Sequence, residues 1–139
     1  MTGPPVKIGI DAPAWLTEPA FTLKEIAALT GAPPNTVSYW STLAAAAGYE
    51  LSVKPGPRRL LSAHGAYVVS VLRHISAAHV TLTASLVKSV LQITFHQGRP
   101  VLPNLFDQLH LHDGPVVIEV ELSQIWLKLE PQLSHFRSY

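Results

Sequence analysis

The chain has 139 residues, enough for one domain or for a small domain with an extension. Hydrophobic residues make up 47% and charged residues 14%, so the sequence is too apolar for a disordered protein and can bury a core. The absence of cysteine excludes disulfides and cysteine-based metal or redox sites, and a net charge of +1 excludes a uniformly basic surface. No signal peptide or membrane-length apolar run is recognisable, so we expect a cytoplasmic protein without membrane contact.

The first 20 residues contain four prolines and predict an N-terminal arm with little regular structure. A short strand is expected at residues 6–10. Trp15 and Leu16 are the large apolar side chains expected to anchor this arm on the rest of the protein.

Residues 21–44 predict a helix-turn-helix. Thr22 followed three residues later by Glu25 is the capping-box pattern that begins a helix. Gly31 suits the left-handed position after a helix, and the prolines at 33–34 suit the first turn of a second helix. Two short helices joined by a glycine-bearing turn form this motif.

The following segment, residues 49–61, predicts a strand, a turn and a second strand. Proline and glycine at 55–57 mark the turn. Lys54, Arg58 and Arg59 surround it, so the hairpin is expected to present a basic tip, or wing.

Two more helices follow. Ser62 is expected to cap a helix of about 15 residues, and a fourth helix is expected at about 83–95. The apolar face of that fourth helix is broad, which suggests burial on two sides, by a second chain or by the C-terminal segment. Its candidate interface residues are Leu86, Val90 and Ile93.

The last third is expected to contain a loop at 97–115, a strand at 116–122 and a helix that Pro131 interrupts near its end. Its apolar side chains fit core packing and also fit a dimer or partner surface. The candidate surface residues are Ile118, Val120, Trp126 and Leu129. The predicted fold is therefore mainly α: an arm at 1–20, a winged helix-turn-helix at 21–96 and a strand–helix extension at 97–139.

The stretch FTLKEIAALTGAPPNTVSYW, followed by a wing with paired arginines and then by LLSAHGAYVVSVLRHI, resembles the DNA-binding domain of MerR-type transcription regulators. The resemblance covers residues 21 to about 95. It implies a bacterial or phage DNA-binding regulator that acts as a homodimer. The positions that match the DNA contacts of the family are Thr22, Lys24, Thr36, Tyr39, Arg58 and Arg59.

Two departures from the family pattern change what the resemblance implies. Ser38 stands where the family has an arginine, and no long dimerisation helix follows the fourth helix. Base reading therefore falls to Pro34, Asn35 and Ser38, of which asparagine can pair with adenine in the major groove.

The sequence predicts a transcription regulator that binds double-stranded DNA, with the helix at 34–43 in the major groove and the wing at 54–59 on the backbone. One alternative is a phage or mobile-element factor, such as an excisionase or a packaging subunit. Another is an antitoxin-like module that binds a protein through its C-terminal segment. No catalytic motif or cofactor motif is present, so neither an enzyme nor a cofactor is expected. The pattern His110-x-His112-Asp113 fits a metal site only if the segment is a strand, and otherwise fits a polar loop.

Overall fold

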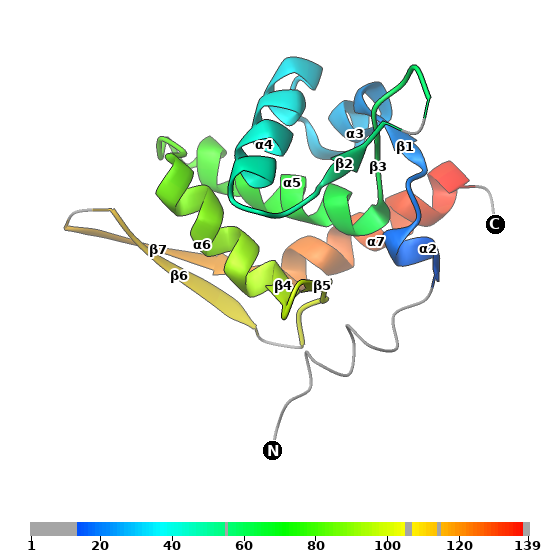
Figure 1. Cartoon of the computed structure of the whole chain (residues 1–139). Coiled ribbons are helices and arrows are strands. Elements are labelled where there is room, and N and C mark those ends of the chain that lie inside the picture. The colour runs from blue at the N-terminus through cyan, green and yellow to red at the C-terminus, as the bar shows by residue number, and fades with distance from the viewer. Residues whose placement is uncertain (1–13, 55, 105–106, 114, 138–139) are drawn as a thin grey trace.

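The computed structural model describes residues 14–54, 56–104, 107–113 and 115–137 (Figure 1). The strand expected at residues 6–10 lies outside these ranges. The described elements are, in chain order, α2 Ala14–Thr17, β1 Phe21–Thr22, α3 Leu23–Thr30, α4 Pro34–Ala46, β2 Ser52–Val53, β3 Leu60–Leu61, α5 Ala63–Ala77, α6 Ala84–Thr94, β4 Phe95–His96, β5 Arg99–Pro100, β6 Gln108–Asp113, β7 Val116–Glu121 and α7 Leu122–Arg137. The fold is mixed α/β, so the expectation of a mainly α protein is partly wrong.

The predicted pair of helices at 21–44 is present as α3 and α4. Glu25 N donates to Thr22 Oγ1 at 3.1 Å and Thr22 N donates to Glu25 Oε1 at 2.8 Å, which is the predicted capping box. Gly31 ends α3 with φ of +83°, a conformation that glycine adopts without strain. The start of α3 and the turn at its end are therefore both determined by residues that are close together in the sequence.

The predicted hairpin at 49–61 is also present, with strands of two residues each. β3 pairs antiparallel with both β1 and β2, so the sheet order is β1-β3-β2. Both residues of β3 are paired on two sides: Leu61 lies opposite Phe21 and Ser52, and Leu60 lies opposite Thr22 and Val53. The hairpin is thereby joined to the start of α3 through β1.

α5 is the centre of the core, and ten of its 15 residues are buried. α2, α3, α6, α7, β3 and β7 all pack against it. A Cβ built at Gly65 would lie 3.0 Å from the carbonyl oxygen of Leu51 and 3.3 Å from Leu61 Cβ. The absence of a side chain at Gly65 thus allows the hairpin to dock closely on α5.

The loop expected at 97–115 is wrong, because this segment contains β5 and β6. Leu109 and Leu111 are buried while His110 and His112 are exposed, which is the two-residue period of a half-buried strand. β6 pairs with β7 over six residues of each strand. Pro100 and Pro103 precede this hairpin, and Pro115 lies in its turn, so none of the three interrupts β6 or β7.

The predicted interruption at Pro131 is wrong as well, since α7 continues to Arg137. Proline deprives the carbonyl of Leu127, four residues earlier, of its helical partner. Leu127 is 52% exposed, so water can satisfy that carbonyl. Leu129 and Leu133 are buried on the opposite side, before and after the proline, and hold both parts of α7 against the core.

Much of the broad apolar face of α6 is covered by the protein itself. α4, α5 and β6 all contact α6, and Val87, Val90 and Leu91 are buried. The C-terminal segment therefore covers part of that face through β6, while Leu86 is half-buried and Ile93 is exposed. Among the described helices, none has the length and hydrophobicity that a membrane span requires.

Candidate nucleic-acid interface

The residues predicted to contact DNA come from three elements that lie near one another. Figure 1 shows α3, α4 and the loop between β2 and β3 on one side of α5, with α7 on the other. Contacts between α3 and α4, α3 and β3, and β2 and β3 hold these elements together. The fold therefore places the start of α3 beside the hairpin, and α4 on another side of α3.

The outer face of α4 is polar but uncharged. Val37, Trp40 and Ala44 are buried and fix the rotation of the helix. Asn35 and Tyr39, one helical turn apart, are exposed, and Tyr39 is 58% exposed, the most exposed large hydrophobic side chain described. Such a face can offer hydrogen bonds to bases and a phenol to a phosphate.

The remaining predicted contacts on α4 are less accessible or less directional. Pro34 is exposed at the first turn, and Thr36 and Ser38 are half-buried. The backbone carbonyl of Ser38 accepts a hydrogen bond from Thr42 Oγ1 at 3.1 Å. Ser38 thus offers only a small hydroxyl at the position where the MerR-type pattern has an arginine.

Positive charge gathers where the start of α3 meets the hairpin. Lys24, Arg58 and Arg59 line a surface hollow of about 330 Å³ together with Thr22 and Leu23. Among the residues that the structure describes, no carboxylate lines this hollow. Three cations around one hollow form a site that attracts a phosphate group.

Local hydrogen bonds position these cations. The capping box occupies the Thr22 hydroxyl as an acceptor and fixes the first turn of α3, on which Lys24 lies exposed. Arg59 Nη1 donates to Ser52 Oγ at 2.9 Å across the hairpin, which holds the guanidinium near β2. Lys54 is exposed at the other end of the hairpin loop and does not line the hollow.

The residues predicted for a dimer or partner surface divide into two groups. Val90 and Val120 are 0% exposed, Trp126 is 7% exposed and Leu129 is 4% exposed, so these four are wrong as surface residues. They belong to the core because α5, α6, β7 and α7 pack together. Leu86 and Ile118 are half-buried and Ile93 is 45% exposed, so these three remain at the surface.

Sequence reasoning missed His64, which is buried on α5. Its Nε2 lies 2.8 Å from the Thr94 carbonyl oxygen and 3.2 Å from the Val101 carbonyl oxygen. Carbonyl oxygens only accept, so Nε2 carries a proton and donates it. Burial lowers the pKa of His64 to about 4, against a smaller opposing effect of these hydrogen bonds. His64 therefore joins α5 to the end of α6 and to the segment after β5, as a structural group.

The histidines at 110 and 112 lie on the exposed face of β6, where a strand places both rings on one side. His110 Nδ1 is 3.8 Å from a Glu119 carboxylate oxygen of β7. The described residues contain no group of three or more side chains suited to hold a metal ion.

Comparisons with known proteins assign neither a family nor a fold relative. No family model, no curated protein and no solved structure matches this chain.

Proposed function

We propose that this protein binds double-stranded DNA through a winged helix-turn-helix formed by α3, α4 and the β2–β3 hairpin. α4 is the recognition helix and enters the major groove. The hairpin is the wing and lies on the flanking backbone. This assignment agrees with the resemblance to MerR-type regulators over the same residues.

The observation that carries the proposal is the hollow formed by Lys24, Arg58 and Arg59. Lys24 precedes the two arginines by more than 30 residues in the sequence, and the β1–β3 pairing brings the start of α3 and the hairpin together. Phosphate contacts supply most of the non-specific affinity of DNA-binding proteins, and a cluster of cations without a carboxylate suits that role.

The uncharged surface of α4 supports assigning affinity and sequence preference to different residues of the site. Asn35 can form paired hydrogen bonds with adenine, and Ser38 discriminates less between bases. Tyr39 extends from the same face and can donate its hydroxyl to a phosphate oxygen. We therefore assign affinity to the cations of α3 and the wing, and sequence preference to the few polar groups of α4 and to DNA shape.

The biological role that fits this site is a cytoplasmic transcription regulator that acts as a dimer. A single short recognition helix with few base contacts specifies little sequence, so two copies reading two half-sites would supply the missing affinity and specificity. The half-buried and exposed apolar residues Leu86, Ile93 and Ile118 are the candidates for contact between the copies.

A salt titration tests the proposal. The affinity for a 30-base-pair duplex of mixed sequence is measured by fluorescence anisotropy between 50 and 200 mM salt. Replacing Arg58 and Arg59 with alanine should weaken binding to all duplexes and reduce the slope of log K against log salt by about two units. The charge-matched control replaces Lys88 and Arg99, which are exposed on α6 and β5, and should leave the slope unchanged.

Equal slopes in the wild type and the double-arginine variant would remove the wing from the site. No binding to any duplex at 50 mM salt, together with co-purification of a protein partner, would favour the antitoxin-like function. A protected palindrome in a footprint of the neighbouring upstream region would support a dimeric regulator, and protection at a recombination or packaging site would favour a mobile-element factor.

A further inference from the structure

A hollow of about 300 Å³ lies where α5, the end of α6, β4 and the start of β6 meet, and it is called the Tyr67 hollow below. α5 contributes Tyr67, β4 contributes Phe95, and Asp107 comes from the position just before β6. None of its described lining residues belongs to the candidate DNA surface. Its volume is at the lower end of the range for small-molecule sites.

Tyr67 turns an unpaired hydroxyl toward this hollow. The side chain is 1% exposed, and its hydroxyl forms no hydrogen bond with any residue that the structure describes. The hydroxyl is not sealed within the core, because Ser41 Oγ is the only described side-chain oxygen or nitrogen that is both fully enclosed and unpaired. It therefore opens onto the hollow that Tyr67 lines. A buried hydroxyl without a partner costs free energy, which a hydrogen bond to a ligand would recover.

Neighbouring rings hold the phenol in this orientation. Its ring centroid is 5.8 Å from that of His64 and 5.9 Å from that of Trp126, and both contacts are edge-on. Burial, together with the negative charge of Asp107, raises the pKa of Tyr67, so the hydroxyl keeps its proton at neutral pH and can both donate and accept. The same effect indicates that the Asp107 carboxylate lies near the phenol.

Asp107 supplies the negative charge of the hollow and is held by the backbone on two sides. Its N donates to the Asn104 carbonyl at 3.0 Å, and Leu122 N donates to the Asp107 carbonyl at 3.1 Å. Asp107 Oδ2 accepts from Asn104 N at 2.7 Å, and no other described group bonds to this carboxylate. No lysine or arginine is among the described lining residues. The half-buried carboxylate therefore retains free acceptor positions and an uncompensated charge.

The walls around these two polar groups are largely apolar. They include Phe95, Val101 and Leu102, and the Phe95 ring is fixed with its centroid 5.0 Å from that of Tyr49. A carboxylate and a phenol beside aromatic and aliphatic walls suit a ligand with a cationic head and an apolar body, since aromatic rings also attract cations. A metal ion would find too few ligands, because the described residues contain no group of three or more suited to hold one.

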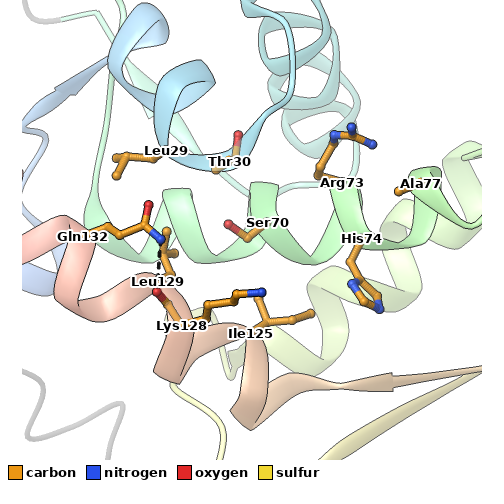
Figure 2. A pocket seen from close by; sticks show the side chains of 10 residues that line it. All are labelled: Leu29, Thr30, Ser70, Arg73, His74, Ala77, Ile125, Lys128, Leu129 and Gln132. Atoms are coloured by element: carbon orange, nitrogen blue, oxygen red, sulfur yellow. Dashed lines mark hydrogen bonds between the residues drawn. The ribbon is translucent and has the colours of Figure 1, made fainter.

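The hollow of about 290 Å³ between α3, α5 and α7 lacks such a convergence (Figure 2). It is lined by two cations, Arg73 and Lys128. In Figure 2 the Arg73 guanidinium points away from Lys128, toward the end of α3, while Lys128 lies along α7. These charges therefore do not meet around one ligand, whereas the polar groups of the Tyr67 hollow do.

We propose that the Tyr67 hollow binds a small organic amine in its protonated form, with the ammonium group on the Asp107 carboxylate and the Tyr67 hydroxyl and the apolar body against Phe95 and Leu102. The ammonium group donates to both oxygen atoms, which completes the hydrogen bonding of the phenol and neutralises the carboxylate. The proposal does not depend on DNA binding.

The test uses the full chain without DNA and follows backbone amide shifts by NMR during titration with three probes of similar shape. Benzylamine carries the proposed ammonium group, benzyl alcohol is neutral and benzoate is an anion. Benzylamine should bind saturably and shift the amides of Tyr67, Phe95 and Asp107. Benzyl alcohol should bind about tenfold more weakly, and benzoate more weakly still.

Two conservative variants locate the ammonium group. Tyr67→Phe removes only the unpaired hydroxyl, and Asp107→Asn removes the charge but keeps an oxygen that can accept from Asn104 N. Each should raise the dissociation constant of benzylamine about tenfold. Glu119→Gln, on the exposed face of β7, is the charge-matched control and should leave it unchanged. The midpoint of thermal unfolding of Tyr67→Phe should stay the same or rise, because the hydroxyl has no partner to lose.

Equal binding of benzylamine and benzyl alcohol would overturn the proposal, since the hollow would then recognise only an apolar body. Shifts that do not saturate, or an unchanged dissociation constant in either variant, would overturn it as well. A lowered unfolding midpoint in Tyr67→Phe would show that the hydroxyl is already bonded within the protein, which also contradicts the proposed site.

Discussion

Residues 21–61 and residues 97–137 both pack against α5, but they leave different surfaces exposed. The first region exposes Lys24, Arg58 and Arg59 around one hollow, and Tyr39 on the outer face of α4. The second exposes histidines and carboxylates on its hairpin, and places its large apolar side chains in the core. The difference indicates that the first region carries the candidate DNA site, whereas the second stabilises α5.

The largest loss of stability is expected from replacing Trp126. If residues 97–139 were only attached to the outside of the protein, Trp126 could be replaced without a loss of stability. Trp126 stacks on Trp15 with ring centroids 6.4 Å apart and meets Tyr67 edge-on at 5.9 Å. Trp126→Ala should lower the free energy of unfolding by about 3–5 kcal/mol in a denaturant titration. Leu127→Ala on the exposed side of α7 is the control and should change it by less than about 0.5 kcal/mol. Equal effects would mean that α7 is not part of the core.

The next effect concerns His64, which connects α5 to the chain on both sides of the β4–β5 turn. Its pKa falls from 6.5 to about 4 on folding, so between these values the unfolded chain takes up a proton that the folded protein does not. The contribution of His64 to the free energy of unfolding should therefore be fully present above pH 6.5, and the free energy should fall by about 3 kcal/mol as the pH drops to 4.

His64→Gln provides the comparison for this pH dependence. Its amide can still donate one hydrogen bond, but it has no proton to gain between pH 6.5 and 4. The difference in unfolding free energy between the wild type and the variant should shrink as the pH falls, whereas the other titratable groups, which both proteins share, affect both equally. Parallel pH profiles would show that folding does not lower the pKa of His64.

A smaller effect is expected where the wing docks on α5. Gly65→Ala places a methyl group 3.0 Å from the Leu51 carbonyl oxygen, so the hairpin has to shift. We expect a loss of about 1–2 kcal/mol, with amide shifts at β2 and weaker DNA binding. Gly56→Ala at the hairpin tip, where nothing lies within 4 Å, should leave the unfolding free energy nearly unchanged. Unaltered β2 amides in Gly65→Ala would show that the wing is not held by this contact.

The smallest effect is local to the start of α3. Thr22→Ala removes the cap and should cost about 1 kcal/mol of unfolding free energy. Thr42→Ala removes only an exposed hydroxyl that bonds within α4, and should change the stability by less than about 0.5 kcal/mol. If Thr22→Ala lost much more than about 1 kcal/mol of unfolding free energy and also lost DNA binding, the cap would be shown to orient Lys24 as well.

The caps, the turn glycine and the basic hairpin could be predicted because each depends on neighbours within a few residues. Thr22, Glu25 and Gly31 define α3 by hydrogen bonds and backbone conformation that any context would favour. Thr22 and Glu25 are half-buried in this cap, whereas Lys24, Arg58 and Arg59 are exposed. The sequence alone thus determined the elements that carry the candidate DNA-binding residues.

The tertiary structure decided which apolar faces are surfaces. Val90, Val120, Trp126 and Leu129 fit an interface and a core equally well as a pattern, because hydrophobic periodicity shows that a face is covered but not by what. Only the packing of α6, β7 and α7 around α5 shows that the same chain covers them.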